Sequence, residues 1–163
     1  MGKLTASYSF EYEVYQSIEE LSTDDAHLVT QARKATELAY APYSNFKVGA
    51  YAQLSNGTFL TGSNQENASY PVGICAERAL LAVAGQLNPI LPIVSMAISY
   101  HHIGFESNTP LSPCGMCRQA LQEYESRVDM PIRLLLSGME GKVWLIKESG
   151  MLLPFSFKGD NLK

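Results

Sequence analysis

Three cysteines and one glutamate form the most chemically informative pattern in this 163-residue sequence. Cys75 stands alone and is followed two residues later by Glu77, while Cys114 and Cys117 form a Cys-x-x-Cys pair about forty residues further on. Three thiolates that leave one position open have the ligand count of a catalytic zinc site. A carboxylate beside such a site can move protons between a metal-activated water and a substrate. The pattern therefore indicates a hydrolytic metal site.

Other interpretations of the same residues stay open at this point. An odd number of cysteines does not fit a secreted disulfide framework, but the Cys-x-x-Cys pair could be redox-active. A structural zinc site would need a fourth protein ligand, for which His101 and His102 are candidates. We interpret both histidines as surface or packing residues that follow a strand. Glu77 could simply favour a helix dipole, but its position beside Cys75 favours proton transfer.

Both cysteine groups are expected at the start of a helix. The Ala- and Leu-rich stretch 75–85, with Gly85 near its end, predicts one buried helix, and 115–126 predicts another. The unpaired N–H groups and the dipole at a helix start favour thiolates. Three thiolates on Zn²⁺ carry a net charge of about −1, which a guanidinium from Arg78 or Arg118 could offset by hydrogen-bonding the sulfurs.

The remaining elements predict a sheet with helices packed on it. Apolar residues at helical spacing predict a helix over 24–40, with Thr23 as its N-cap and Pro42 beyond its end. Period-two alternation predicts a half-buried strand over Tyr8–Val14. Further strands are expected over 46–54 and 58–62, joined by an Asn-Gly hairpin, and over 93–100, 132–136 and 142–146. This order of elements is typical of an α/β sandwich with mixed strand directions.

Composition limits the classes of protein to which the chain can belong. Hydrophobic residues make up 46% and charged residues 17%, which is enough apolar content for a single domain over 1–163. The net charge is −4 and the twelve basic residues are scattered, which argues against a nucleic-acid partner or a polybasic membrane patch. No apolar run reaches the roughly 18–20 residues of a membrane span, and no signal-peptide core follows the N-terminus. A cytoplasmic location is expected.

Longer motifs show a resemblance to a known family. Cys-Ala-Glu at 75–77 followed by Pro-Cys-x-x-Cys at 113–117 is similar to the zinc-dependent nucleobase deaminases. Three further segments resemble the small homotetrameric cytidine deaminases: Tyr-Ala-Pro-Tyr-Ser-Asn-Phe-Lys-Val-Gly-Ala at 40–50, Asn-Gln-Glu-Asn-Ala-Ser-Tyr-Pro at 64–71 and Leu-Leu-Pro-Phe-Ser-Phe at 152–157. The resemblance runs from about residue 21 to residue 162, which implies that residues 1–20 are an N-terminal extension.

The resemblance implies a fold and a reaction. The fold is a three-layer α/β/α sandwich around a mixed, roughly five-stranded sheet, to which the N-terminal strand is an addition. The reaction is hydrolytic deamination of cytidine and 2′-deoxycytidine to uridine and 2′-deoxyuridine, with release of ammonia, in pyrimidine salvage. Cys75, Cys114 and Cys117 would hold one Zn²⁺ per chain. Glu77 would carry the protons, and Arg78 would hydrogen-bond the ligand sulfurs.

The resemblance also implies the residues that contact the nucleoside: Phe46, Asn64, Glu66, Ala76 and Phe157. Phe46 would pack against the pyrimidine ring, and Asn64 and Glu66 would hydrogen-bond the ribose 3′-hydroxyl. The backbone N–H of Ala76 would bind the pyrimidine carbonyl. Phe157 would come from a neighbouring subunit, so that a homotetramer would share its active sites.

Two other functions are compatible with parts of the sequence. A deaminase of another aminopyrimidine nucleoside should lack the complete ribose segment 64–71, and the presence of that segment favours cytidine. A non-catalytic zinc or thiol-redox module is the third possibility. A zinc titration with a thiol count would separate this module from the deaminases, because bound zinc should protect all three cysteines. Two segments depart from the family pattern, namely the N-terminal stretch 4–15 and a loop at 100–111 that is longer than in the minimal form.

Overall fold

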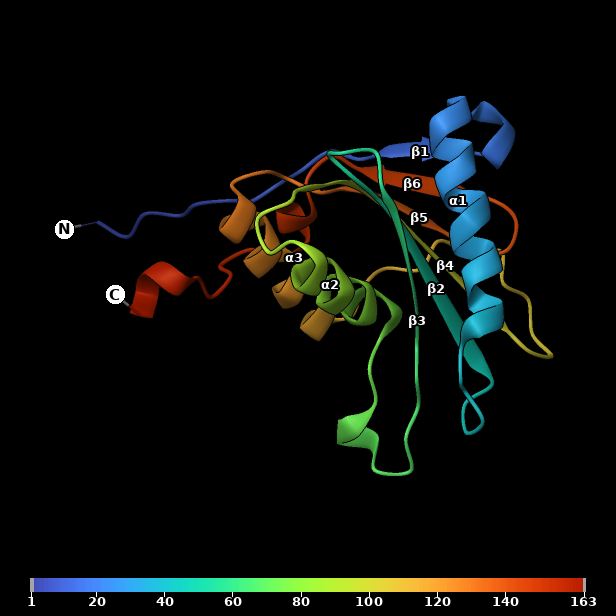
Figure 1. The fold of residues 1–163 in the computed structure, drawn as a ribbon. Coiled ribbons are helices and arrows are strands. Elements are labelled where there is room, and N and C mark those ends of the chain that lie inside the picture. The colour runs from blue at the N-terminus through green and yellow to red at the C-terminus, as the bar shows by residue number, and fades with distance from the viewer. Residues whose placement is uncertain (1, 163) are drawn as a thin grey trace.

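The structure, a computed structural model that describes residues 2–162, is built around one mixed β-sheet (Figure 1). Over those residues the sheet has six strands in the order β1-β6-β5-β4-β2-β3. All neighbouring strands pair antiparallel except β4 and β5, which are parallel. The strands are β1 (Glu13–Tyr15), β2 (Phe46–Leu54), β3 (Phe59–Ser63), β4 (Ile93–His102), β5 (Arg133–Ser137) and β6 (Val143–Ile146). The expected mixed α/β sheet, five strands with an N-terminal addition, is confirmed.

Helices cover both faces of this sheet. Figure 1 shows α1 (Thr23–Ala35) on one face and α2 (Ala76–Leu87) with α3 (Gly115–Val128) on the other. Central strand β4 is buried on both faces, which explains its nearly continuous apolar sequence. Its Ala97 packs with the α1 side, whereas Met96 and Ile98 pack with the α2 and α3 side. Short 3₁₀ helices complete the chain: Ile18–Glu20, Thr36–Leu38, Tyr70–Val72, Ser149–Leu152 and Gly159–Leu162.

Several expected boundaries are corrected. The N-cap of α1 is Ser22, not Thr23, because the Ser22 hydroxyl accepts a hydrogen bond of 3.2 Å from the backbone N–H of Asp25. The α-helix ends at Ala35 and tightens into the 3₁₀ turn that follows, so it does not continue to residue 40. Helix α2 passes through Gly85 and ends at Leu87. The other strand and helix ends lie within two residues of those expected.

The prediction of a strand over Tyr8–Val14 is largely wrong, because only β1 pairs with the sheet, at its β6 edge. The alternating aromatic side chains make ring contacts with one another instead. The ring centres of Tyr12 and Trp144 lie 5.4 Å apart. The Tyr8 hydroxyl donates a hydrogen bond of 2.8 Å to the carbonyl of Met151. The N-terminal segment thus lies beside the C-terminal part of the chain, and both ends project together from the body of the molecule (Figure 1).

One glycine allows α2 to approach the sheet closely. A Cβ atom on Gly62 of β3 would overlap the carbonyl oxygen of Ala76, which belongs to the first residue of α2. We therefore expect Gly62→Ala to destabilise the fold by about 2–3 kcal/mol through overpacking. Chemical denaturation would measure this loss against Gly159→Ala, where the added methyl group meets nothing within 4 Å. Equal stability of the two variants would contradict the close packing.

Among the described residues, no helix has the length and apolar character required to cross a bilayer.

Candidate metal centre and substrate pocket

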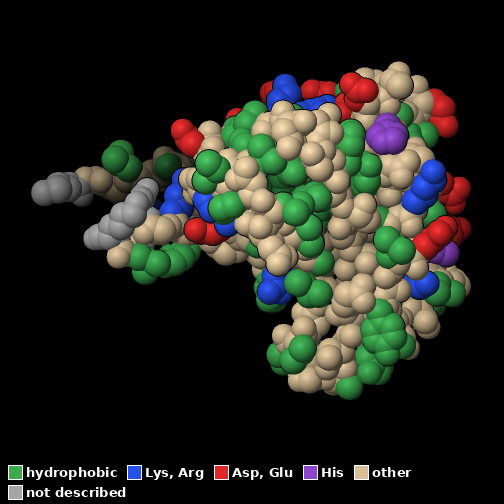
Figure 2. Space-filling model, viewed as in Figure 1, with side chains coloured by type: hydrophobic (Ala, Val, Ile, Leu, Met, Phe, Trp, Pro, Cys, Tyr) green, Lys and Arg blue, Asp and Glu red, His purple; other side chains and the backbone are tan. Residues whose placement is uncertain are grey.

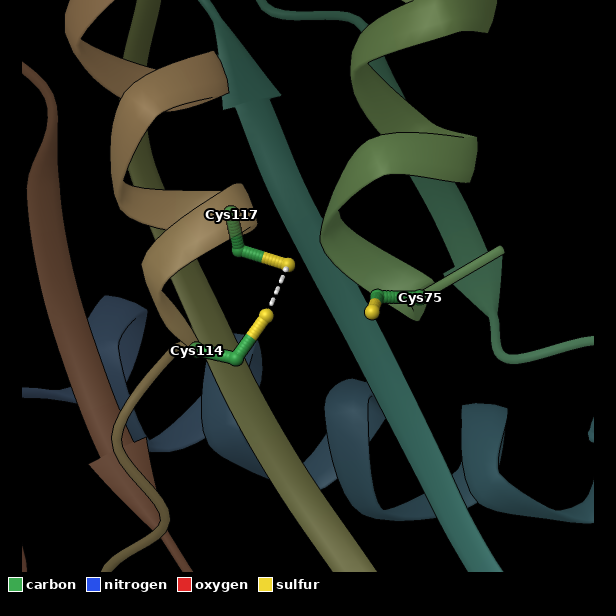
Figure 3. Close-up of side chains that lie close together, drawn as sticks. All are labelled: Cys75, Cys114 and Cys117. Atoms are coloured by element: carbon green, nitrogen blue, oxygen red, sulfur yellow. Dashed lines mark hydrogen bonds between the residues drawn. The ribbon is translucent and has the colours of Figure 1, made fainter. Parts of the chain in front are cut away.

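The three cysteine sulfurs lie together in the structure. All three atoms are within 4.8 Å of one another, and Cys114 Sγ lies 3.5 Å from Cys117 Sγ. Figure 3 shows Cys114 and Cys117 projecting from the first turn of α3 toward Cys75, which lies at the start of α2. Neither His101 nor His102 belongs to this group among the described residues. The cluster therefore consists of thiols alone.

Helix geometry explains why these sulfurs meet. Cys75 and Cys114 are the N-cap residues of α2 and α3, and neither side chain makes a capping hydrogen bond. The first intrahelical bonds begin at their carbonyl oxygens, from Ala79 N and Arg118 N, each at 2.9 Å. The earlier N–H groups of both helices lack such partners, so two positive helix ends face the sulfur cluster.

The electrostatics of the cluster fit a bound cation. A hydrogen bond from Cys117 lowers the pKa of the Cys75 thiol to about 6, and the charge of Arg78 acts in the same direction, against burial and the charge of Glu77. The same bond to Cys75, together with burial, raises the pKa of Cys117. Three soft sulfur donors around one point, from only two helix starts, match the donor set of a three-cysteine zinc site with one open position.

Glu77 lies in the first turn of α2, with only 4% of its surface exposed. Burial raises the pKa of its carboxyl group above the ordinary value. A carboxylate whose pKa is moved toward neutrality can both accept and return a proton at physiological pH. Glu77 therefore has the electrostatic properties of a proton carrier rather than those of a solvated helix-dipole residue.

A pocket of about 700 Å³ opens beside the cluster. Cys75, Cys114, Glu77 and Arg78 line it on the helix side. Three of the expected nucleoside contacts line it as well: Phe46, Asn64 and Glu66. Ala76 is fully buried, and Phe157 lies apart on the exposed C-terminal segment, where its carbonyl accepts a hydrogen bond from Gln119. Phe46, Asn64 and Glu66 are thus brought together, whereas Ala76 is not among the lining residues and Phe157, for which the resemblance implied a neighbouring subunit, lies apart.

Phe46 rests on two residues of β4, of which the sequence singled out His102 but not Tyr100. Its ring stacks on Tyr100 with 4.9 Å between centres and an angle of 16° between planes. His102 contacts the same ring edge-on at 5.4 Å, so this histidine has a packing role, as expected. The direct pairing of Phe46 with His102 across β2 and β4 creates this cluster. Long-range strand register was the only signal that could have identified it.

Asn64 is more constrained than the sequence suggested. Its side-chain oxygen accepts from the backbone N–H of Val48 at 2.7 Å, and its side-chain nitrogen donates to the carbonyl of Phe46 at 2.9 Å. The amide group has two donor hydrogens and two acceptor lone pairs, so one of each remains. Asn64 therefore holds the first residues of β2 in place and still offers one donor and one acceptor to a ligand.

Glu66 is held by the turn that precedes β2. Its carboxylate accepts hydrogen bonds from the backbone N–H groups of Tyr43 and Ser44, at 2.9 and 3.3 Å, and from the Ser44 hydroxyl at 2.5 Å. The hydroxyl contact is the largest cause of a lowered pKa at Glu66. The group is therefore an ionised acceptor that faces the pocket.

Arg118 donates hydrogen bonds to backbone carbonyl groups, whereas the sequence offered it as a candidate donor to the cysteine sulfurs. Its Nε donates to the carbonyl of Pro113 at 2.9 Å and a terminal nitrogen donates to the carbonyl of Leu152 at 3.1 Å. The side chain thus fixes the turn that precedes Cys114 and attaches the C-terminal segment to it. Because Leu152 is 34 residues away in sequence, no local pattern could have predicted this link.

Exposed hydrophobic side chains lie on the two segments beside the pocket, and one of them, Tyr70, lines it. Figure 2 shows them at the lower end of the molecule, where the segments 40–46 and 64–73 lie in Figure 1. Large apolar residues exposed in these segments are Tyr40, Tyr43, Tyr70 and Val72. An exposed apolar patch of this kind is typical of an interaction surface.

Comparison with known proteins agrees with this geometry. Residues 22–130 match the family model described as cytidine and deoxycytidylate deaminase zinc-binding region. A protein of Halalkalibacterium halodurans named cytidine deaminase is 33% identical over 141 residues, which cover 85% of this chain and 98% of the relative. A cytidine deaminase of Mycoplasma pneumoniae is 45% identical over 87 residues, and that match covers 53% of this chain and 61% of the relative.

A solved structure from the same family has a similar fold. The crystal structure of cytidine deaminase from Burkholderia pseudomallei is similar with a TM-score of 0.71 and 36% sequence identity. The similarity covers 84% of this chain and 100% of the other. The two chains therefore share most of the fold.

Proposed function

Because the chain belongs to the cytidine and deoxycytidylate deaminase family, whose members include zinc-dependent cytidine deaminases, we propose that it converts both cytidine and 2′-deoxycytidine to the corresponding uridines with release of ammonia. The observation that carries this proposal is the grouping of three sulfurs beside one pocket, which the buried carboxylate of Glu77 and the ring of Phe46 also line. Such a reaction belongs to pyrimidine salvage in the cytoplasm.

In the proposed site, Cys75, Cys114 and Cys117 hold one zinc ion per chain. Zinc supplies Lewis acidity that lowers the pKa of a water toward neutrality. Arg78 lies beside the cluster, and its positive charge partly offsets the negative charge of the thiolates. The two helix starts contribute in the same direction, because their N–H groups point toward the sulfurs.

Glu77 is the proposed proton carrier. Its carboxylate accepts a proton from the attacking water and delivers it to N3 of the pyrimidine as the new C4–O bond forms. It then carries the second proton of that water to the exocyclic amine, the C4–N bond breaks, and ammonia leaves. Burial supports this role because the raised pKa of Glu77 makes both transfers favourable near neutral pH.

The nucleoside itself is bound by the pocket walls. Phe46 packs against the pyrimidine ring from the platform that Tyr100 provides. The free N–H of Ala76, at the first position of α2, binds the pyrimidine carbonyl. The remaining hydrogen-bonding capacity of Asn64 and the ionised carboxylate of Glu66 bind the ribose 3′-hydroxyl.

A homotetramer with shared sites is proposed as the active assembly. The exposed apolar patch beside the pocket and the projecting C-terminal segment that carries Phe157 support it, because a neighbouring subunit would cover both. The family match begins at residue 22, so residues 1–20 are proposed as an extension to a single domain. The scattered positive charge favours a nucleoside over a nucleic-acid strand.

The test is loss of the cytidine ultraviolet band on incubation with the zinc-loaded protein. Conversion of cytidine and 2′-deoxycytidine, each with one ammonia released per uridine formed, is the expected result. Zinc-loaded protein that leaves both nucleosides intact would contradict the proposal. Conversion of a different aminopyrimidine nucleoside in that case would support the alternative substrate.

A further inference from the structure

We propose that Ser44 is a positioning residue that holds the ribose-binding carboxylate of Glu66 at a fixed place relative to the base-packing ring of Phe46, and that it thereby makes binding depend on the ribose 3′-hydroxyl. This inference rests on the proposed function, because it assumes that Phe46 and Glu66 contact the two halves of a nucleoside. Ser44 itself lines the pocket.

The hydroxyl group of Ser44 joins the two residues directly. It donates a hydrogen bond of 2.5 Å to one oxygen of the Glu66 carboxylate and accepts one of 3.0 Å from the backbone N–H of Phe46. A hydroxyl is the smallest side-chain group that can donate to one partner and accept from another at once. A single oxygen atom thus connects the start of β2 with the carboxylate that follows β3.

The backbone around Ser44 supports the same arrangement. Asn45 adopts a left-handed conformation with φ of 55°, and its N–H donates to the carbonyl of Ala41 at 3.1 Å. This turn aims the N–H groups of Tyr43 and Ser44 at the second oxygen of Glu66. The carboxylate is therefore held through both oxygens, one by the backbone and one by the serine hydroxyl.

The two kinds of contact have different consequences when one is lost. Without the hydroxyl, Glu66 would keep its two backbone N–H partners, so the turn and the fold would persist. Oε1 of Glu66, which the Ser44 hydroxyl binds, would then be hydrated and free to move. The backbone N–H of Phe46 would also lose its acceptor. The ribose contact would weaken while the aromatic platform under Phe46, which is built by β4, stays in place. Ser44 therefore affects ribose recognition selectively.

The experiment compares inhibition constants of uridine and 3′-deoxyuridine against cytidine turnover, in zinc-loaded wild type, Ser44→Ala and Ser44→Thr. Ser44→Ala is expected to weaken uridine binding by about tenfold, the effect of losing one hydrogen bond to a charged group. Binding of 3′-deoxyuridine should change less than about twofold, since the contact is already absent there. Ser44→Thr keeps the hydroxyl and should restore uridine binding.

Ser63→Ala provides a matched control. The Ser63 hydroxyl also makes two hydrogen bonds, to the carbonyl of Leu38 and from the side chain of Gln65, and its loss should leave both inhibition constants unchanged. Equal weakening of both ligands by Ser44→Ala, no weakening of either, or failure of Ser44→Thr to restore uridine binding would each overturn the inference. A zinc-loaded wild type that does not deaminate cytidine would instead overturn the proposed function.

Discussion

Glu77→Gln is expected to lower kcat/KM for cytidine by about 10²–10⁴-fold, the usual contribution of a positioned acid–base group. Glutamine has nearly the same shape, but it cannot accept the proton of the attacking water or pass it to N3. Zinc content should stay at the wild-type level, because all three sulfurs remain. The change would therefore separate proton transfer from metal binding in one measurement of initial rates and bound metal.

The same substitution is expected to stabilise the protein when the metal has been removed. The raised pKa of Glu77 means that the folded chain holds this proton more tightly than the unfolded chain does. That contribution to stability is present below the ordinary value of 4.5 and is lost as the pH rises through the raised value. Above the raised value, the wild type therefore buries a charge that the glutamine variant lacks.

We expect the metal-free Glu77→Gln variant to unfold at a higher temperature than the metal-free wild type at a pH above the raised value, by about 2–4 °C for each kcal/mol of stabilisation. The difference should shrink as the pH is lowered through the raised value, because the wild-type carboxyl group then takes up its proton. Glu123→Gln, a change at an exposed carboxylate of α3, should alter neither rate nor stability. Full activity of Glu77→Gln, or a stability difference that is independent of pH, would contradict the assigned role.

The three grouped cysteines of the proposed metal site could be predicted from sequence because each signal is local. Cys75 and Glu77 belong to one helix start, as Cys114 and Cys117 belong to another, and the residue types alone restrict the chemistry. Helix starts are recognised within a few residues, so the convergence of two such ends on one sheet face followed from the order of elements. The fold class was predictable for the same reason.

Contacts between distant segments could not be predicted in this way. The bond from Arg118 to Leu152 and the use of the Asn64 amide by the β2 backbone depend on how loops pack. The aromatic alternation around Tyr8 was misleading for a related reason. A period of two indicates only that side chains alternate in direction. In this segment the aromatic rings contact one another and Trp144, and the backbone does not pair with the sheet before β1.

Loss of the metal is expected to abolish turnover. Cys114→Ala removes one ligand at an exposed position, so its packing cost should be small, while activity should fall by at least about 10³-fold because the Lewis acid is lost. Ser126→Ala, near the other end of α3, should retain zinc and activity. Normal zinc content in Cys114→Ala would contradict the three-sulfur site.

Thiol reactivity gives a direct measure of the same site, because the chain has three cysteines and all of them belong to the cluster. Zinc-loaded protein should protect all three from a thiol reagent. After chelation, the accessible Cys75 and Cys114 should react first and the fully buried Cys117 last. A thiol that reacts quickly in the presence of zinc would show that its sulfur is not a ligand.

The protons released on zinc binding test the electrostatics of the cluster most sharply. Thiols bind zinc as thiolates, so each protonated ligand must lose a proton. The pKa of Cys75 is lowered to about 6, whereas the pKa of Cys117 is raised. At pH 7.5 Cys75 should therefore bind zinc without releasing a proton, so that fewer than three protons are released per zinc ion, measured by calorimetry in buffers of different ionisation enthalpy. Zinc affinity should fall as the pH is lowered, and more steeply below about pH 6, where Cys75 is protonated as well. A release of three protons at pH 7.5 would show that Cys75 is not ionised before the metal arrives.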